Sequence, residues 1–287
     1  MVTIKADAKI NLTLDILGKR PDGYHEVAMV MQEISLADEI RVEQQATGIR
    51  LELDKKELPA DNSNLAWKAA QLFIDTAGLN CGVSIKIKKN IPIAAGLAGG
   101  SADAAGVLRG MNELFDCGFS VAELCKIGEK LGSDVPFCIC GGTMLATGRG
   151  EILRRLPNLP ECFIVIAKPP ISVSTAWAYK TYDELGADSH PDNSSFLLAL
   201  ERDDFNSICE LGRNVLEDVT KRKYSEINRY KEIMYQNGAR MAMMSGSGPT
   251  VFALTEKEEI AVKIAAAIRE NEDAEAVYIV KPIYRNE

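Results

Sequence analysis

The chain has 287 residues, of which 46% are hydrophobic and 26% are charged. This composition supports a buried core and excludes a disordered or fibrous protein. The formal net charge of −8 argues against a general nucleic-acid or membrane-surface binder, because such proteins present a basic face to their anionic partners.

No apolar stretch approaches the roughly 18 residues of a membrane-spanning helix, and the first residues show no secretory signal pattern. The seven cysteines are scattered, and Cys138 and Cys140 have C-x-C spacing rather than the C-x-x-C spacing of a zinc site. We therefore expect a cytoplasmic protein with reduced thiols.

Strand and helix patterns alternate irregularly along the chain. Apolar residues at every second position predict strands over 4–16, 27–34, 39–42, 49–53 and 83–87. Helical spacing predicts helices over 64–77, from Ser101 to Phe115, and over 121–131. Short buried strands are predicted at 143–146 and 162–167. This mixture lacks the regular βαβα order of a doubly wound sheet and predicts an α+β fold.

A proline-containing connector at Leu153–Pro160 indicates a domain boundary. The length of the chain is also comfortable for two domains. We therefore divide the chain into an N-terminal domain, 1–155, and a C-terminal domain, 156–287.

The segment from Ile91 to Asp103 is rich in glycine and alanine and lies between a predicted strand and a predicted helix. Small residues let a ligand approach the backbone, and the first N–H groups of a helix lack partners within that helix. The helix dipole adds partial positive charge, so this end suits a phosphate. Ser101 can cap the helix, or it can offer its hydroxyl to a phosphate or to Mg²⁺. A tight turn that packs closely for steric reasons is the alternative.

The common nucleotide motifs are absent from this segment. The pattern G-x-x-x-x-G-K-[ST] does not occur, because the Gly18-Lys19 step is followed by Arg20. The G-x-G-x-x-G spacing is absent here as well, and the chain lacks the H-R-D and D-F-G motifs of protein kinases. The loop therefore belongs to another class of phosphate-binding loop.

Three motifs together resemble those of a family of small-molecule kinases that includes galactokinase, homoserine kinase, mevalonate kinase and phosphomevalonate kinase. Pro92–Ala105 is similar to the phosphate loop of this family, and Lys9–Leu12 to its N-terminal motif. Ser245–Thr250, followed by the strand Val251–Leu254, is similar to its third motif.

Further stretches narrow the resemblance to the branch of the family that phosphorylates the 2-hydroxyl of a cytidine diphosphate ester of methylerythritol. These stretches are Lys9–Leu17 with Lys19–Glu26, then Gly132–Phe137, and Val173–Thr175 with Tyr179. The resemblance therefore covers nearly the whole chain, and the combination of motifs is more specific than any one of them.

This resemblance implies an N-terminal domain like the second domain of ribosomal protein S5 and a ferredoxin-like C-terminal domain. The first would bind the nucleotide and carry out catalysis, and the second would bind the substrate, in a step of the non-mevalonate isoprenoid pathway. ATP would lie on the glycine-rich loop and carry Mg²⁺ with it, without a dedicated metal site in the protein. We expect a monomer or weak homodimer whose partners are small molecules, not nucleic acid or membrane.

The phosphate loop departs from the family pattern in its alanines. Ala94, Ala95 and Ala98 stand where family members often carry glycine, and Ala102 stands in place of a second serine. Alanine is small enough for the loop to close on a phosphate, but it makes positive φ angles at these positions less expected.

Lys9 and Asp134 are the candidate catalytic residues. The resemblance implies that Asp134 orients the substrate hydroxyl and takes its proton, while the spacing beside Gly132 and Pro136 alone would favour a helix cap or a turn. Lys9 would keep that carboxylate ionised or stabilise the transferred phosphoryl group. A lysine on an exposed strand face is its alternative.

The remaining candidate residues follow from the resemblance. The phosphate loop would contribute Pro92, Ala94, Ala95, Gly96, Leu97, Ala98, Gly99, Gly100, Ser101 and Ala102, and the adenine pocket Asn64, Leu65 and Lys89. The substrate would contact Asn11, Tyr24, His25, Thr175, Tyr179, Ser245, Gly246, Ser247 and Gly248, with Tyr179 stacked on the cytosine ring. Three of these assignments have an alternative without a ligand. His25 could be a surface or packed side chain, Tyr179 a surface tyrosine, and Ser245–Thr250 a hairpin corner.

Two other functions compete with this one. The chain could be another kinase of the same family, acting on mevalonate, homoserine or a sugar, but Tyr24, His25 and the Val173–Tyr179 stretch favour a nucleotide-bearing substrate. It could instead bind a nucleotide without catalysis, but Lys9 and Asp134 together argue for chemistry.

Overall fold

The structure is a computed structural model that describes residues 1–271 and 273–285. The chain packs into two compact units, and each unit draws on separate stretches of sequence. Unit 1 comprises Met1–Ala8, Leu36–Ile91 and Ala98–Gly141, and unit 2 comprises Lys9–Ser35, Pro92–Leu97 and Gly142–Glu287. The long strands β1 (Val2–Lys19) and β2 (His25–Gln45) contribute residues to both.

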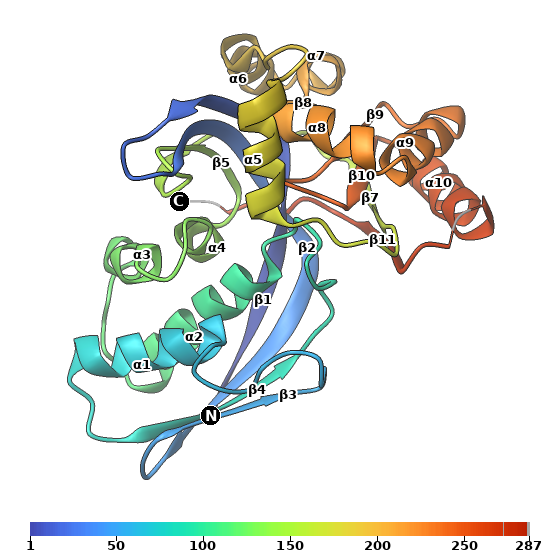
Figure 1. Ribbon diagram of the computed structural model, residues 1–287. Helices are drawn as coiled ribbons and strands as arrows, with labels where there is room; N and C mark the ends of the chain where they lie inside the picture. The colour runs from blue at the N-terminus through green and yellow to red at the C-terminus, as the bar shows by residue number, and fades with distance from the viewer. Residues whose placement is uncertain (272, 286–287) are drawn as a thin grey trace. The chain divides into compact units, whose positions relative to one another are not determined.

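In unit 1, helices lie against strands at the beginning of β1 and the end of β2 (Figure 1). The end of β2 pairs antiparallel with β4, from Glu39 opposite Lys88, and β3 pairs parallel with β4. The other elements of this unit are β3 (Ile49–Leu53), β4 (Gly82–Lys88), α1 (Leu65–Ala77), α2 (Gly99–Leu114), α3 (Val121–Glu129) and α4 (Val135–Cys140).

Glycines let α2 approach the strands of unit 1 closely. A Cβ at Gly106 would lie 2.5 Å from the Ile40 side chain, and one at Gly110 would lie 3.0 Å from Val42. These two glycines are four residues apart, so they share one face of the helix. This face of α2 continues to its first turn, which contains the last residues of the glycine-rich segment. Close packing of α2 therefore determines the position of these residues within unit 1.

Unit 2 contains a four-stranded antiparallel sheet in the order β11-β7-β10-β9. Numbered in chain order, these strands are the fourth, first, third and second, which is the order of a ferredoxin-like sheet. The helices α9 and α10 pack against this sheet (Figure 1). The elements of this sheet and its cover are β7 (Phe163–Lys168), β9 (Met241–Met244), β10 (Val251–Thr255), β11 (Ala276–Val280), α9 (Glu226–Gln236) and α10 (Glu258–Asn271).

The rest of unit 2 surrounds the end of β1 and the start of β2. Here β2 pairs antiparallel with β5, β5 pairs antiparallel with β6, and β1 pairs parallel with the short β8. The remaining elements are β5 (Thr143–Thr147), β6 (Ile152–Arg155), β8 (Arg213–Asn214), α5 (Thr175–Leu185), α6 (Asn193–Glu201), α7 (Phe205–Leu211) and α8 (Val215–Lys223). Among the described residues, no helix has the length and apolar character needed to cross a membrane.

The structure confirms the α+β class and the three predicted helices, with ends shifted by a few residues. The predicted strands are present, but the strands predicted at 27–34 and 39–42 form one continuous strand, β2. Helix α4 was not predicted, and no ranges were predicted for the helices after β7. The predicted boundary between 155 and 156 stays a prediction, because the two packing units are interleaved along the sequence.

Candidate active site

Lys9 is a buried cation on β1, with an exposed fraction of 4%. Its Nζ donates to Asn11 Oδ1 at 2.6 Å and to the carbonyl oxygen of Gly96 at 3.3 Å. Lys9 and Asn11 are two residues apart on a strand and therefore point to the same side. Both of these acceptors are neutral, so no described carboxylate of unit 2 balances the charge of the ammonium group.

The motif Ser245–Thr250 forms the connection between β9 and β10, so the predicted hairpin corner is present. The loop is closed by the Ser245 N–H, which donates to the Thr250 carbonyl at 2.9 Å. This corner also packs against the candidate residues of unit 2. Ser245 Oγ donates to the Gly96 carbonyl at 3.0 Å, and a Cβ at Gly246 would lie 3.5 Å from Lys9 Nζ.

Asn214 supports this corner, although the sequence analysis did not identify it. Its Nδ2 donates to the carbonyls of Met244 at 2.8 Å and Gly246 at 2.7 Å, while its Oδ1 accepts from Leu216 at the start of α8. Asparagine before a helix is a signal for an N-cap, but the contacts with the corner join residues about thirty positions apart and leave no local pattern.

The glycine-rich segment takes up positive φ angles at alanines as well as at glycine. Ala94 has φ 50°, Gly96 has φ 74° and Ala98 has φ 59°. The expectation that alanine would disfavour this backbone is therefore wrong at Ala94 and Ala98. A left-handed alanine costs about 1–2 kcal/mol, and such strain is typical of functional segments. Gly96 cannot carry a side chain, because a Cβ there would overlap the carbonyl oxygen of Ser245.

Helix α2 begins at Gly99, with Ala98 as its N-cap and without any side-chain cap. Ser101 lies in the first turn and does not cap the helix. Because no side chain occupies the N-terminal N–H groups, they suit an anion. Asn64 caps α1 by accepting from the Ala66 N–H at 2.9 Å, and Leu65 is the first residue of that helix. Their predicted contacts with adenine stay predictions.

Lys89 is buried with an exposed fraction of 8%, but its charge is balanced. Its ammonium group pairs with Asp38 and, at 2.6 Å, with Asp103 of α2. Although burial acts to lower it, the charges of Asp103 and Asp38 raise the pKa of Lys89 above its ordinary value. This ammonium group is therefore committed to a structural ion pair, and its predicted role at adenine stays a prediction.

Asp134 occupies the N-cap position of α4, but its carboxylate makes no capping hydrogen bond. Asp134 therefore stands at the N-cap position that the spacing alone predicted, but its side chain does not form the capping hydrogen bond. Pro136 in the first turn and Gly141 at the end define this short helix. Lys9 lies in unit 2 and Asp134 in unit 1, so their pairing stays a prediction.

In unit 2, the ring of His25 lies against that of Tyr179, and the exposed Tyr24 ring lies beside Arg149. The ring centroids of His25 and Tyr179 are 4.9 Å apart with an interplanar angle of 35°, and the Arg149 guanidinium lies 5.2 Å from the Tyr24 ring centroid. His25 Nε2 is 2.6 Å from Asp183 Oδ1. Neither Arg149 nor Asp183 was identified from the sequence.

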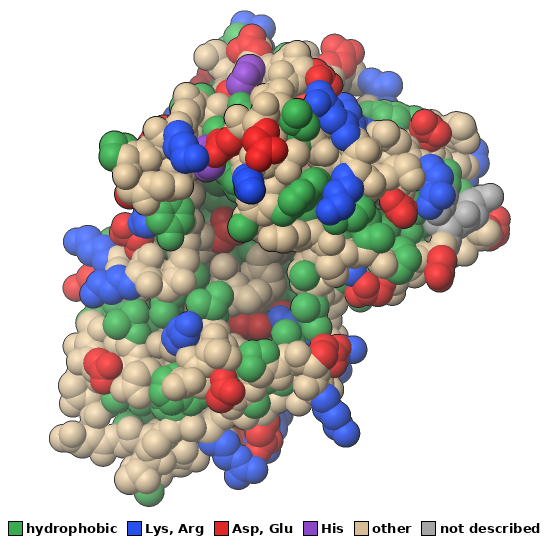
Figure 2. Space-filling model, viewed as in Figure 1, with side chains coloured by type: hydrophobic (Ala, Val, Ile, Leu, Met, Phe, Trp, Pro, Cys, Tyr) green, Lys and Arg blue, Asp and Glu red, His purple; other side chains and the backbone are tan. Residues whose placement is uncertain are grey.

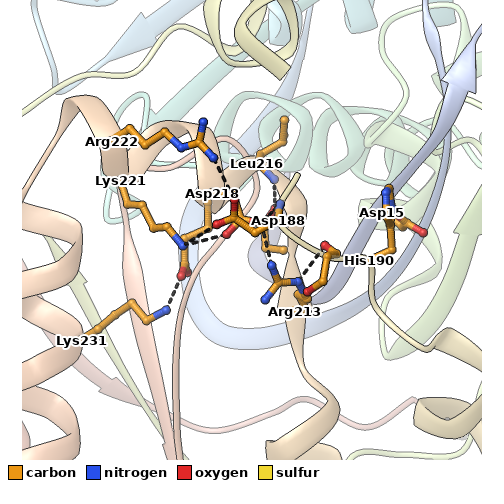
Figure 3. A network of polar contacts seen from close by, with 12 residues as sticks. Asp15, Asp188, His190, Arg213, Leu216, Asp218, Lys221, Arg222 and Lys231 are labelled. Atoms are coloured by element: carbon orange, nitrogen blue, oxygen red, sulfur yellow. Dashed lines mark hydrogen bonds and ion pairs between the residues drawn. The ribbon is translucent and has the colours of Figure 1, made fainter. Parts of the chain in front are cut away.

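Helix α5 carries Thr175 and Tyr179. Thr175 Oγ1 is 2.9 Å from Ser247 Oγ, which links this helix to the β9–β10 corner. The chain after α5 is held by Asp218 of α8, which accepts from the Asp188 N–H at 3.1 Å and from Arg213 at 2.7 Å (Figure 3). Ion pairs therefore fix the segment that follows this part of the candidate site.

Charged side chains of both signs are interspersed on the face drawn in Figure 2. Within residues 1–271 and 273–285, no group of three or more His, Cys, Asp or Glu side chains could hold a metal ion.

Comparisons with known proteins show the family to which the chain belongs. The description "GHMP kinases N terminal domain" matches residues 64–142, and "GHMP kinases C terminal" matches residues 196–274. The 4-diphosphocytidyl-2-C-methyl-D-erythritol kinase of Geobacillus kaustophilus (strain HTA426) is 50% identical over 270 residues, which are 93% of each chain. The enzyme of the same name from Acetivibrio thermocellus is 47% identical over 271 residues, 94% of this chain and 96% of that one.

A solved structure, the crystal structure of a 4-(cytidine 5'-diphospho)-2C-methyl-D-erythritol kinase, is also similar. It has a TM-score of 0.82 and 32% sequence identity, covering 98% of this chain and 99% of that one. The chain therefore belongs to the GHMP kinases and, within them, to the family of 4-diphosphocytidyl-2-C-methyl-D-erythritol kinases.

Proposed function

We propose that this protein transfers the γ-phosphoryl group of ATP to the 2-hydroxyl of 4-(cytidine 5'-diphospho)-2-C-methyl-D-erythritol, a step of the non-mevalonate isoprenoid pathway. The relatives named above support the substrate. The observation that carries the chemistry is Lys9, a buried ammonium group with only neutral acceptors in its unit. A buried charge is costly without a counter-charge, and an anionic substrate group would provide one.

The phosphates of ATP would bind along the glycine-rich segment. Gly96 brings the backbone of this segment against Ser245, and the uncapped first turn of α2 offers N–H groups to an anion. These features fit a triphosphate, which supplies the phosphoryl group while Mg²⁺ on its oxygens neutralises part of its charge. Lys9 would stabilise the charge on the phosphoryl group in flight.

Asp134 would orient the 2-hydroxyl of the substrate and accept its proton as the oxygen bonds to phosphorus. Its carboxylate makes no capping hydrogen bond and so keeps its acceptor capacity. Phosphoryl transfer needs mainly positioning and electrostatic stabilisation, so one oriented carboxylate suffices for the proton. The cytidine end would lie against Tyr24, His25 and Tyr179, with Asn11, Thr175 and Ser245–Gly248 around the rest of the substrate. A monomer or weak homodimer in the cytoplasm stays our expectation.

The proposal is tested by a coupled assay of ADP release on the purified protein with ATP and Mg²⁺. The cytidine diphosphate ester, mevalonate and homoserine are offered in parallel, and we expect ADP only with the first. ADP with mevalonate or homoserine alone would replace the proposed substrate. Binding of ATP without ADP from any of these alcohols would show a protein that binds the nucleotide without this chemistry.

Asp134→Ala tests the proposed base against an aspartate that caps a helix. We expect Asp134→Ala to lower kcat by about 10²–10⁴-fold, the range for one general base, with little change in stability because no cap is lost. Asp204 is a matched control, because it caps α7 by accepting from the Ser207 N–H at 3.1 Å. Asp204→Ala should lose about 1 kcal/mol of stability and keep its kcat. Equal loss of stability in both variants, with kcat retained, would make Asp134 a structural residue.

A further inference from the structure

Helices α3 and α4 of unit 1 bring two thiols into contact. The helices lie side by side (Figure 1), and the sulfur atoms of Cys125 in α3 and Cys140, the last residue of α4, are 3.4 Å apart. Both cysteines are half-buried and both are free thiols. The sulfurs of a disulfide lie about 2 Å apart, so a short movement would bring this pair to bonding distance.

The two helices pack closely beside this pair. A Cβ at Gly128 of α3 would lie 2.8 Å from Val135 and 3.0 Å from Ile139 of α4. The backbone of α3 therefore approaches these side chains as closely as a glycine allows. Because such packing leaves little free space, α4 has to move as a unit when its last residue is displaced.

Asp134, the proposed base, lies at the other end of α4. It is the N-cap residue, and its carbonyl accepts from the Cys138 N–H at 3.1 Å. The Cys125 thiol also donates to the carbonyl of Pro136, in the first turn of α4, at 3.6 Å. This thiol therefore contacts both ends of the six-residue helix whose N-cap is the proposed base.

We propose that Cys125 and Cys140 are a site of reversible modification, at which a low-molecular-weight disulfide converts the two thiols into an intramolecular disulfide that lowers turnover. The effect on turnover rests on the proposed function. The bond brings the sulfurs from 3.4 Å to about 2 Å and removes the hydrogen bond to the Pro136 carbonyl, so α4 and Asp134 are displaced. A displacement of about 1 Å at a catalytic group can cost about 10²-fold in rate.

The modification is a thiol–disulfide exchange in two steps. The hydrogen bond with Cys140 and burial raise the pKa of the Cys125 thiol, so Cys125 keeps its proton and Cys140 attacks first. The Cys140 sulfur loses its proton, bonds to one sulfur of the small disulfide and expels the other as a thiolate, which takes up a proton. Cys125 then loses its proton, attacks the Cys140 sulfur and expels the second small thiol. The two cysteines are oxidised, and one small disulfide is reduced to two thiols.

The first test follows the bond and does not depend on activity. The purified full-length protein is incubated with oxidised glutathione at about pH 8.5, where a larger fraction of thiols is ionised. Mass spectrometry of proteolytic peptides should find Cys125 joined to Cys140, and dithiothreitol should separate them. In Cys125→Ser, Cys140 should instead carry glutathione. The proposal is overturned if the two cysteines of the wild-type protein do not join.

The second test measures turnover of the oxidised and the reduced protein in the ADP-release assay. We expect oxidation to lower kcat about 10²-fold and dithiothreitol to restore it. Cys140→Ser lacks the attacking sulfur and should keep its kcat after the same treatment. Cys117→Ser, at a half-buried position outside the pair, should respond like the wild type. An unchanged kcat in protein that carries the bond would contradict the proposal.

Asp134→Ala separates displacement of the base from a general distortion of unit 1. Oxidation should leave the residual turnover of this variant unchanged, because the carboxylate that the disulfide displaces is already absent. A further fall as large as that of the wild type would show that the bond acts elsewhere and would overturn the proposal. If the reduced wild-type protein releases no ADP with the cytidine ester, the proposed function fails, and the peptide analysis still decides whether the two thiols join.

Discussion

Two of the buried lysines, Lys89 in unit 1 and Lys9 in unit 2, differ in what balances their charge. Lys89 lies between Asp38 and Asp103 in unit 1, whereas Lys9 in unit 2 donates only to an amide oxygen and a backbone carbonyl. Burial alone therefore does not show what a lysine does. A buried lysine that is paired with carboxylates stabilises the fold. A buried lysine with only neutral acceptors in its unit indicates that an anionic group of a ligand provides the counter-charge.

The balanced lysine also supports the start of the phosphate segment. Asp38 Oδ1 accepts from the N–H groups of Asn90 at 2.6 Å and Ile91 at 2.8 Å, and the same carboxylate group pairs with Lys89. A Cβ at Gly99 would lie 3.6 Å from Lys89 Nζ. Lys89 and its two carboxylates therefore hold, within unit 1, the chain that enters the loop and the first turn of α2.

The largest effect that we expect is on the free energy of unfolding, and it tests the difference between Lys89 and Lys9. Lys89→Met leaves two buried carboxylates without their cation, and we expect a loss of about 3–5 kcal/mol in the free energy of unfolding. Urea unfolding measures this, and Lys88→Met, at the exposed neighbouring position, should stay near the wild-type value. An unchanged stability of Lys89→Met would remove the distinction between the two lysines.

Lys9→Met should have the opposite profile. Removal of the unbalanced cation should lower kcat by about 10²–10³-fold, equivalent to about 2.7–4 kcal/mol, as for other groups that stabilise charge in the transition state. Stability should stay unchanged or rise, because the variant no longer buries a charge that no described carboxylate of unit 2 compensates. The ADP-release assay and urea unfolding check both expectations, with Lys5→Met at an exposed position of β1 as the control. Near-normal turnover would contradict the catalytic role.

Much of the fold could be predicted because its signals are local. The alternation in the first strand, the helical spacing after Ser101 and the capping residue Asn64 each depend on neighbours in sequence. The short helix α4 was missed because six residues give little periodicity. The start of α2 was placed two residues late because its N-cap is a left-handed alanine, which the sequence does not suggest.

In the candidate site, only the residues that lie within the family motifs could be predicted from the sequence. The resemblance named Lys9, the loop around Gly96 and the corner at Ser245, and in unit 2 the structure brings these together. It did not name Asp183, whose contact with His25 spans 158 positions along the chain. Nor could it show that Lys89 is balanced by Asp38, because that pairing depends on the packing of separate strands and a helix.

The smallest expected effect concerns the second carboxylate of the balanced lysine. Burial raises the pKa of Asp103 to about 7 against the charge of Lys89, and its Oδ1 has no hydrogen-bond partner among the described residues. Between the ordinary pKa and this raised one, the folded state keeps a proton that the unfolded state has lost. Stability therefore falls as the pH rises through this window.

Asp103→Asn removes this titration while keeping an acceptor for Lys89. Relative to this variant, we expect the wild-type free energy of unfolding to fall by about 2–3 kcal/mol between roughly pH 5 and pH 8. Urea unfolding of both proteins across this range provides the measurement. A difference that is flat with pH would mean that Asp103 is ionised throughout. Lys89 would then be balanced by two full negative charges, and the contrast with Lys9 would become sharper.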